Sequence, residues 1–198
     1  MDLDQKYLAL DLELNNAPDG LTPNPSIIQV GVTIGSARQL PSEWIVKKWF
    51  VKVNEPIYPF ITELTGITTD DVKNGLQHYD IANELDRLIK DNNVFVNPVT
   101  WGGGDASELK ADFERWGVEF KNFGRRWIDV KTWYALHMFA KGKKPNGGLS
   151  SALGEYRLPF EGQAHRADVD AYNTLRLFFH ILKKQFSMES LIRQAQSI

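Results

Sequence analysis

The first clear pattern in the chain is an unbroken apolar run that two acidic residues interrupt. Residues 7–10 read Tyr-Leu-Ala-Leu, and Asp11 and Glu13 follow with one leucine between them. An apolar stretch of this kind predicts a strand buried inside a sheet, here over residues 7–13. Side chains two positions apart on a strand point to the same face. We therefore expect both carboxylates to project together, about 7 Å apart at roughly 3.4 Å of rise per residue.

Further apolar stretches predict the strands that accompany the first one. Residues 26–34 read Ser-Ile-Ile-Gln-Val-Gly-Val-Thr-Ile, and residues 47–53 read Lys-Lys-Trp-Phe-Val-Lys-Val. The short connections between these segments favour an antiparallel meander of three strands. Two more strands are expected over residues 94–101, which Pro98 interrupts, and over residues 124–129.

Helical periodicity dominates the rest of the chain, with apolar residues recurring every three or four positions. The expected helices cover residues 61–66, 81–91, 105–116, 130–139, 149–156 and 166–186, and a short terminal helix or tail covers residues 188–198. Three strands followed by alternating helices and strands predict an α/β fold. Its expected form is a mixed five-stranded sheet flanked by helices on both faces.

The composition is that of an ordinary globular protein, and it narrows the classes of function. The chain has 198 residues, of which 42% are hydrophobic and 24% charged, so we expect a single domain over residues 1–198. It contains no cysteine, which excludes disulfides, thiolate zinc sites and cysteine nucleophiles. Without a signal-peptide pattern or a membrane-length apolar run, we expect a soluble cytoplasmic protein. The net charge of −2 argues against a broadly basic duplex-binding surface.

Two further segments place acidic residues at the starts of predicted helices. Asp105 follows three glycines, where it could simply be an N-cap. Residues 164–171 read Ala-His-Arg-Ala-Asp-Val-Asp-Ala, with His165 at the mouth of the longest helix. Asp168 suits the positive end of the helix dipole. Asp170 lies next to an alanine on the apolar side of the helix, where a carboxylate needs a partner.

Strand ends and helix starts can converge on one crevice of an α/β sheet. The acidic residues that could meet there are Asp11, Glu13, Asp105 and Asp170. Carboxylates in one crevice repel each other, and divalent cations such as Mg²⁺ or Mn²⁺ would turn that repulsion into a binding site. Two metals can hold the attacking water and the leaving oxygen of phosphodiester hydrolysis, and a neutral histidine can take the proton of the water. Taken singly, each acid has a structural alternative, a solvated strand or a helix cap.

The three motifs in this order make the chain resemble the DEDDh 3′–5′ exonucleases. That family includes the bacterial proofreading subunit, ribonuclease T and oligoribonuclease. The resemblance covers about residues 7–182 of the chain. Its first motif corresponds to residues 10–13 (Leu-Asp-Leu-Glu), and its second to Asp105 with Leu109 four positions on. The third corresponds to residues 165–171 (His-Arg-Ala-Asp-Val-Asp-Ala), which is the most specific of the three.

The resemblance implies an RNase H-like fold and an enzyme that releases nucleoside 5′-monophosphates from single-stranded or frayed DNA or RNA 3′ ends. It implies two divalent cations, Mg²⁺ or Mn²⁺, and His165 as the general base. The metal ligands that it implies are Asp11, Glu13, Asp105 and Asp170. A homodimer or a polymerase-type partner is compatible with it. Two alternatives stay open: an RNA-trimming or oligoribonuclease-type enzyme, and a non-catalytic nucleic-acid or protein-binding module on the same fold.

The residues that would bind the nucleic acid are less sharply marked. Where many family members carry Thr-Gly after the first glutamate, this chain has Leu14 followed by an asparagine, and Leu14 could wedge against a base. Leu109 is a second apolar candidate from the motifs. Basic residues could hold phosphates upstream of the cleaved bond, or they could be solvated surface. These basic candidates are Lys141, Lys143, Lys144 and Arg166.

Overall fold

A computed structural model describes the backbone of residues 2–196 and the side chains of residues 2–187. Its centre is a five-stranded sheet in the order β3-β2-β1-β4-β5. The first three strands, β1 (Lys6–Asn15), β2 (Ser26–Ser36) and β3 (Ile45–Phe50), form an antiparallel meander. The last two, β4 (Val99–Thr100) and β5 (Ile128–Asp129), continue the sheet in parallel to β1. The predicted mixed sheet and its meander are confirmed.

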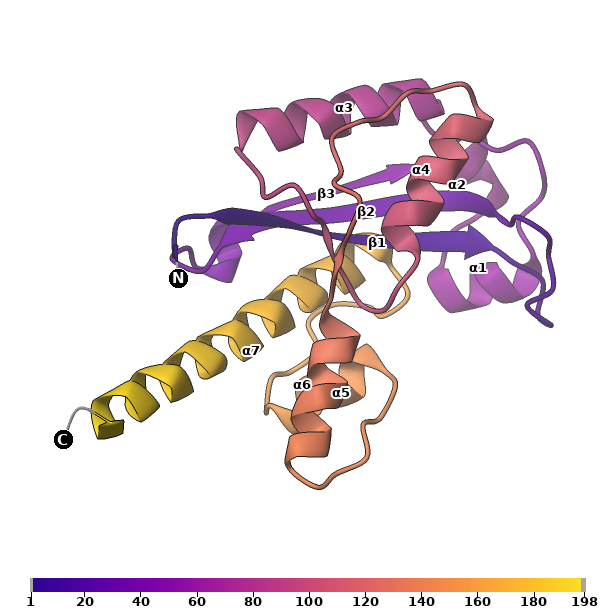
Figure 1. The fold of residues 1–198 in the computed structure, drawn as a ribbon. Coiled ribbons are helices and arrows are strands. Elements are labelled where there is room, and N and C mark those ends of the chain that lie inside the picture. Colours follow the sequence, from indigo (N-terminus) through magenta and orange to yellow (C-terminus); the bar gives the residue numbers. More distant parts are fainter. Residues whose placement is uncertain (1, 197–198) are drawn as a thin grey trace.

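Helices cover both faces of this sheet, as predicted, and Figure 1 shows the layers. Helices α3 (His78–Asp91) and α4 (Asp105–Arg115) pack on one face. The other face carries α5 (Val130–Ala140), α6 (Leu149–Glu155) and α7 (Ala167–Gln196). Short helices precede β3 and follow it; they are η1 (Pro41–Glu43), α1 (Pro59–Thr65) and α2 (Thr69–Lys73).

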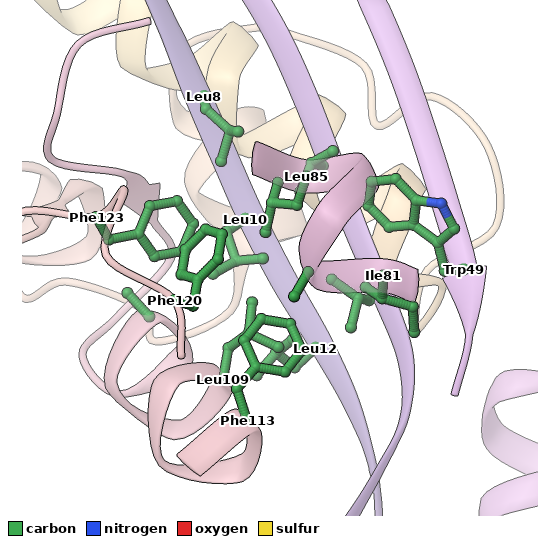
Figure 2. Close-up of a cluster of buried hydrophobic side chains, with 14 of the residues drawn as sticks. Leu8, Leu10, Leu12, Trp49, Ile81, Leu85, Leu109, Phe113, Phe120 and Phe123 are labelled. Carbon is green, nitrogen blue, oxygen red and sulfur yellow. The ribbon is translucent and has the colours of Figure 1, made fainter. Parts of the chain in front are cut away.

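Strand β1 sends alternate side chains to the two helical layers, because successive residues of a strand point to opposite faces. Leu8, Leu10 and Leu12 lie in the core beneath α3 and α4, which Figure 2 shows in close-up. Ala9 lies in the second core, on the side of α7. Asp11 and Glu13 continue the row of Ala9 along the strand. The alternation therefore directs both carboxylates to the face that α7 covers.

The first turn of α7 sits directly on the middle of β2. A Cβ atom at Gly31 would lie only 2.0 Å from the carbonyl carbon of Ala167, so glycine alone allows this approach. The side chain of Gln29, which is fully buried, accepts a hydrogen bond of 2.9 Å from the backbone N–H of Ala167. Gly31 pairs with Asp11 and Gln29 pairs with Glu13 in the β1–β2 register. The seat of α7 is thus next to the two carboxylates of β1.

The ends of several elements differ from their predicted positions. Strand β3 begins at Ile45 rather than residue 47, and β4 keeps only Val99–Thr100 of the predicted segment 94–101. Pro98 has no N–H to donate to the sheet, so it interrupts the pairing of this segment with β1. Before Pro98, the segment pairs with β1 only through an isolated bridge between Lys6 and Val94. Strand β5 is likewise shorter than predicted.

Helix α7 is one continuous helix of 30 residues, Ala167–Gln196. The expected break near residue 187 is wrong, because the helix runs on through most of the predicted terminal segment 188–198. Residues 197 and 198 lie outside the described part of the chain. Among the described residues, none of the helices combines the length and apolar character that a membrane span requires.

The close packing of α7 on β2 gives the first testable prediction. Replacing Gly31 with alanine should lower the free energy of unfolding by about 3 kcal/mol, the upper end of the usual cost of overpacking. A matched control is Gly154→Ala in α6, because nothing lies within 4 Å of a Cβ at that position. That control should leave stability unchanged or raise it by up to about 1 kcal/mol. Urea unfolding followed by tryptophan fluorescence measures both, and equal midpoints for the two variants would contradict the packing argument.

Candidate active site

Three carboxylates come together between β1 and the first turn of α7. One side-chain oxygen from each of Asp11, Glu13 and Asp170 lies within 4.8 Å of the others. All three side chains are half-buried. The strand supplies two of them at a spacing of two residues, and the helix supplies the third, so the predicted convergence of separate elements is observed.

Asp105 lies at the edge of this group, at the beginning of α4. It is the first residue of the helix, and Gly104, with a φ of 133°, occupies the N-cap position. Burial raises the pKa of Asp105 to about 6; its backbone hydrogen bond opposes this rise and the negative charge of Asp129 adds to it. The charge of Asp105 in turn helps to raise the pKa of Asp11. The fourth acid therefore acts electrostatically on Asp11 and Glu13, although it is not within the group of closest oxygens.

Asp129 fixes the glycine loop that precedes Asp105. Its Oδ1 atom accepts a hydrogen bond of 3.1 Å from the backbone N–H of Gly102. The same oxygen accepts bonds from the backbone N–H groups of Lys131 and Thr132, which caps helix α5. One side chain thus fixes the end of β5, the start of α5 and the glycine loop before α4.

The carboxylates lie close together, and their burial and mutual repulsion raise their pKa values. Burial raises the pKa of Asp11 well above its ordinary value, and the charges of Asp105, Asp170 and Glu13 add to this effect. Burial and the charge of Asp170 raise the pKa of Glu13 to about 8, while the charge of Arg166 opposes that rise. Converging hard oxygen donors that lack sufficient compensating positive charge fit a divalent cation of the Mg²⁺ or Mn²⁺ type.

His165 reaches the site from the loop before α7, not from the helix itself. Its backbone has a φ of 62°, a left-handed conformation that residues other than glycine seldom adopt. Its backbone N–H donates a hydrogen bond of 2.8 Å to Oδ2 of Asp170, and its side chain is exposed. Burial raises the pKa of Asp170, and this hydrogen bond and the nearby charge of His165 lower it. The backbone of His165 is therefore tied to the acid cluster while its imidazole stays accessible.

Arg166 lies close to the cluster, in contrast to the other basic candidates. Its charge lowers the pKa of Glu13 and also that of Asp71. Asp71 forms a reciprocal capping box with Thr68 at the start of α2. The Nε atom of Arg166 is buried and has no hydrogen-bond partner among the described residues. The charge of Arg166 thus acts on both the acid cluster and the start of α2.

The remaining substrate-binding candidates lie farther from the acids or inside the core. Leu109 is almost fully buried in the core under α4, and Leu14 packs against that core while half-buried. Lys141 lies over the ring of Tyr156, 5.5 Å from its centre. Lys143 pairs with Glu155 at 3.0 Å and Lys144 is exposed. A substrate-binding role for these residues stays a prediction.

Three residues that organise the site were absent from the sequence-based candidates. Gln29 and Gly31 seat α7, and Asp129 fixes the loop of Asp105. Gln29 did leave a signal, because it is a polar residue in the middle of the apolar run 26–34. Asp129, in the pair Ile128-Asp129 before a helix, is a lesser mark of the family resemblance but was not taken as a site residue. Gly31 carries no such mark, since glycine in a strand has ordinary structural explanations.

Comparisons with known proteins agree with this geometry. A family model described as exonuclease, RNase_T, matches residues 8–178. The chain is 26% identical over 158 residues to the "3'-5' exonuclease DinG" of Staphylococcus epidermidis, covering 80% of the chain and 16% of that protein. It is 28% identical over 135 residues to the "DNA polymerase III PolC-type" of Streptococcus pneumoniae, covering 68% of the chain and 9% of that protein. The chain therefore spans only a small part of the length of these relatives.

Among solved structures, the nuclease domain of 3'hExo, described as a DEDDh family member bound to rAMP, has the same fold. Its TM-score is 0.78 at 18% identity, and the match covers 91% of this chain and 92% of that domain. This likeness confirms the expected RNase H-like fold. Since the family model spans most of the chain and the acid motifs lie within it, the chain belongs to the RNase_T exonuclease family and carries its DEDDh pattern.

Proposed function

We propose that this chain is a metal-dependent 3′–5′ exonuclease that removes nucleoside 5′-monophosphates from single-stranded or frayed 3′ ends. The observation that carries the proposal is the convergence of Asp11, Glu13 and Asp170 within 4.8 Å. In an exonuclease family, such a cluster has a direct use in phosphodiester hydrolysis. Both helical layers pack on one sheet, which supports the expectation of a single exonuclease domain.

The proposed metal ligands are the four acids of the cluster and its edge, Asp11, Glu13, Asp105 and Asp170. Two divalent cations held there would stabilise the negative charge on the attacking and leaving oxygens of the displacement. The chain contributes two strand carboxylates on one face, a helix carboxylate that meets them, and a fourth acid fixed through Asp129. Arg166 supplies a permanent positive charge beside Glu13.

We propose His165 as the general base. Its side chain is exposed at the edge of the cluster, and its backbone hydrogen bond to Asp170 limits how far the loop can move. A strained left-handed residue at such a position is typical of functional sites, where the surrounding structure maintains the strain. A neutral imidazole has a free ring nitrogen that can accept a proton from water, which is the role of a general base.

Two alternatives differ from this proposal in substrate or in chemistry. An RNA-trimming or oligoribonuclease-type enzyme would share the whole site, and the neighbour 3'hExo was solved with rAMP, a ribonucleotide. The relatives named DinG and PolC-type DNA polymerase III are much longer proteins than this chain, and a polymerase-type partner or a homodimer is compatible with our proposal. A non-catalytic module would have no use for crowded carboxylates with raised pKa values.

The proposal predicts stepwise shortening of a 5′-labelled single strand in the presence of Mn²⁺ or Mg²⁺. Matched DNA and RNA strands, resolved on a denaturing gel, report both the activity and the preferred sugar. The products at the 3′ end should be nucleoside 5′-monophosphates, and Asp11→Asn should abolish the ladder. Internal cleavage, or no ladder on either strand with Mn²⁺, would rule out the proposed activity.

The raised pKa of Glu13 predicts an unusual dependence of stability on pH. A carboxyl group whose pKa rises from 4.5 unfolded to about 8 folded holds its proton more tightly in the folded state. Stability without metal should therefore fall as pH rises through that window. Glu13→Gln removes this loss, so in EDTA at pH 8 the variant should be more stable than wild type by about 2–4 kcal/mol. At pH 4.5 the two proteins should have similar stability.

Metal should reduce this difference in stability. Ions that bind only the folded state stabilise it, by about 2.7 kcal/mol at a hundredfold excess over Kd. Mn²⁺ should therefore raise the melting temperature of wild type at pH 8 more than that of Glu13→Gln. Thermal melts at two pH values, with EDTA or Mn²⁺, test both statements. If both proteins gain equally from Mn²⁺, Glu13 is not a ligand.

The roles of His165 and Asp170 can be separated by a pair of variants. Loss of a general base typically slows chemistry by about 10²–10⁴-fold, so His165→Ala should do so in single-turnover cleavage. It should leave the Mn²⁺-dependent rise in melting temperature nearly intact, because the backbone N–H bonded to Asp170 is retained. Asp170→Asn should reduce both the rate and the metal response. Near-normal turnover by a folded His165→Ala protein would exclude the histidine as the base.

A further inference from the structure

A basic hollow lies between the end of α5 and the middle of α7, away from the carboxylates. Its volume is about 700 Å³. The charged and titratable residues that line it are His137, Lys141, His180, Lys183 and Lys184. The three lysines are exposed, and none of them pairs with a carboxylate among the side chains described for residues 2–187. This concentration of positive charge stands out on a chain whose net charge is −2.

The positive charges of the lysines are concentrated around one small part of the surface. The ammonium groups of Lys141 and Lys184 both lie over the ring of Tyr156, at 5.5 Å and 5.0 Å from its centre. Burial lowers the pKa of His137, and the charges of Lys141 and Lys184 lower it further. His180 behaves in the same way, with burial as the main cause and neighbouring lysines as the second. All of these positive charges would attract an anion in the hollow.

The hollow lies at the end of α5 and at the middle of α7, and the first turns of both helices lie near the candidate active site. Helix α5 follows Asp129, and α7 carries Asp170 in its first turn. The helices lie on the same face of the sheet in Figure 1, and Trp133 contacts Phe178 at 5.9 Å between their ring centres. Lys184 follows Asp170 by 14 positions in one continuous helix. At roughly 1.5 Å per residue, the two are about 21 Å apart along the helix axis.

A second hollow adjoins the basic one. It has a volume of about 370 Å³ and shares His137, Ala140 and Gln185 with its neighbour. Its remaining walls are the apolar side chains of Trp133, Leu136, Ile181 and Leu182. The indole of Trp133 is 38% exposed, in the first turns of α5 and thus on the side nearer the carboxylates. An accessible aromatic ring followed by a basic hollow is the combination that holds single strands without reading their sequence.

We propose that the two hollows together form a binding track for the single strand upstream of the 3′ end that enters the carboxylate site. The proposal rests on the proposed exonuclease function for the direction of the strand. Trp133 stacks with a base, and Lys141 and Lys184 contact phosphates. A stacked strand advances about 3.4 Å per nucleotide, so about 21 Å corresponds to roughly six nucleotides. Strands of three nucleotides are too short to reach the basic hollow.

The test compares the double variant Lys141→Gln/Lys184→Gln with a control of equal charge change, Lys47→Gln/Lys52→Gln. Lys47 lies on edge strand β3, and both control lysines are exposed. Fluorescence anisotropy in EDTA, where no hydrolysis occurs, gives the affinity for a labelled 12-nucleotide strand over a range of salt concentrations. Loss of two phosphate contacts should reduce the slope of log K against log salt by about 1.4. It should weaken binding near 0.1 M salt about tenfold, and the control should change neither.

Two further measurements complete the test. Trp133→Leu should weaken binding of the 12-nucleotide strand several-fold without changing the salt slope, because stacking releases no counterions. In EDTA, the double-lysine variant and the wild type should bind a labelled trinucleotide equally, because that strand does not reach the basic hollow. An unchanged slope in that variant, or no binding of the 12-nucleotide strand by the wild type, overturns the track and leaves the hollows to a protein partner. Because binding is measured without catalysis, these outcomes are independent of whether the enzyme cuts.

Discussion

The close contact between α7 and β2 is the constraint on which the site depends. Gly31 lets the backbone of Ala167 approach the sheet, and Gln29 holds the first N–H of the helix. Only from this seat does the first turn of α7 bring Asp170 to the two acids of β1. The buried face of α7, with Ala171, Leu175 and Phe178, anchors the rest of the helix in the second core; the geometry at the acids therefore rests on ordinary apolar packing.

The core supplies the rigidity that an electrostatically unfavourable arrangement needs. Like charges at this separation would move apart if their supports could relax. On one face of the sheet, Leu10 and Leu12 lock β1 against α3 and α4, and on the other face α7 closes over Asp11 and Glu13. The acids cannot spread without disrupting one of the two cores. The repulsion between the acids thus lowers stability locally, and the two cores keep the site arranged before a ligand binds.

Much of this arrangement could be predicted from the sequence, because local patterns encode it. The spacing of Asp11 and Glu13 places both on one strand face, and the start of α7 places His165 in a loop and Asp170 on a helix. The mixed five-stranded sheet, its antiparallel meander and both helical layers followed from the succession of elements along the chain. Contacts between residues far apart in the chain leave no such local pattern in the sequence. Gln29 and Ala167 are 138 positions apart, and neither the bond between them nor the backbone approach at Gly31 leaves a periodic signal. Residues 188–198 were expected as a separate short helix or a tail, whereas α7 continues without a break to Gln196.

The distance between the acids along the chain also constrains how the protein is made. Asp11 lies in the first strand and Asp170 in the last helix, so the site joins residues from nearly opposite ends of the described chain. A ribosome releases the first strand early, but the three acids can meet only after the first turn of α7 has left the exit tunnel. Until then the growing chain lacks one of its three central acids, together with His165, which also lies late in the sequence. A nascent chain therefore cannot assemble this site before residues 165–170 have been synthesised and have left the tunnel.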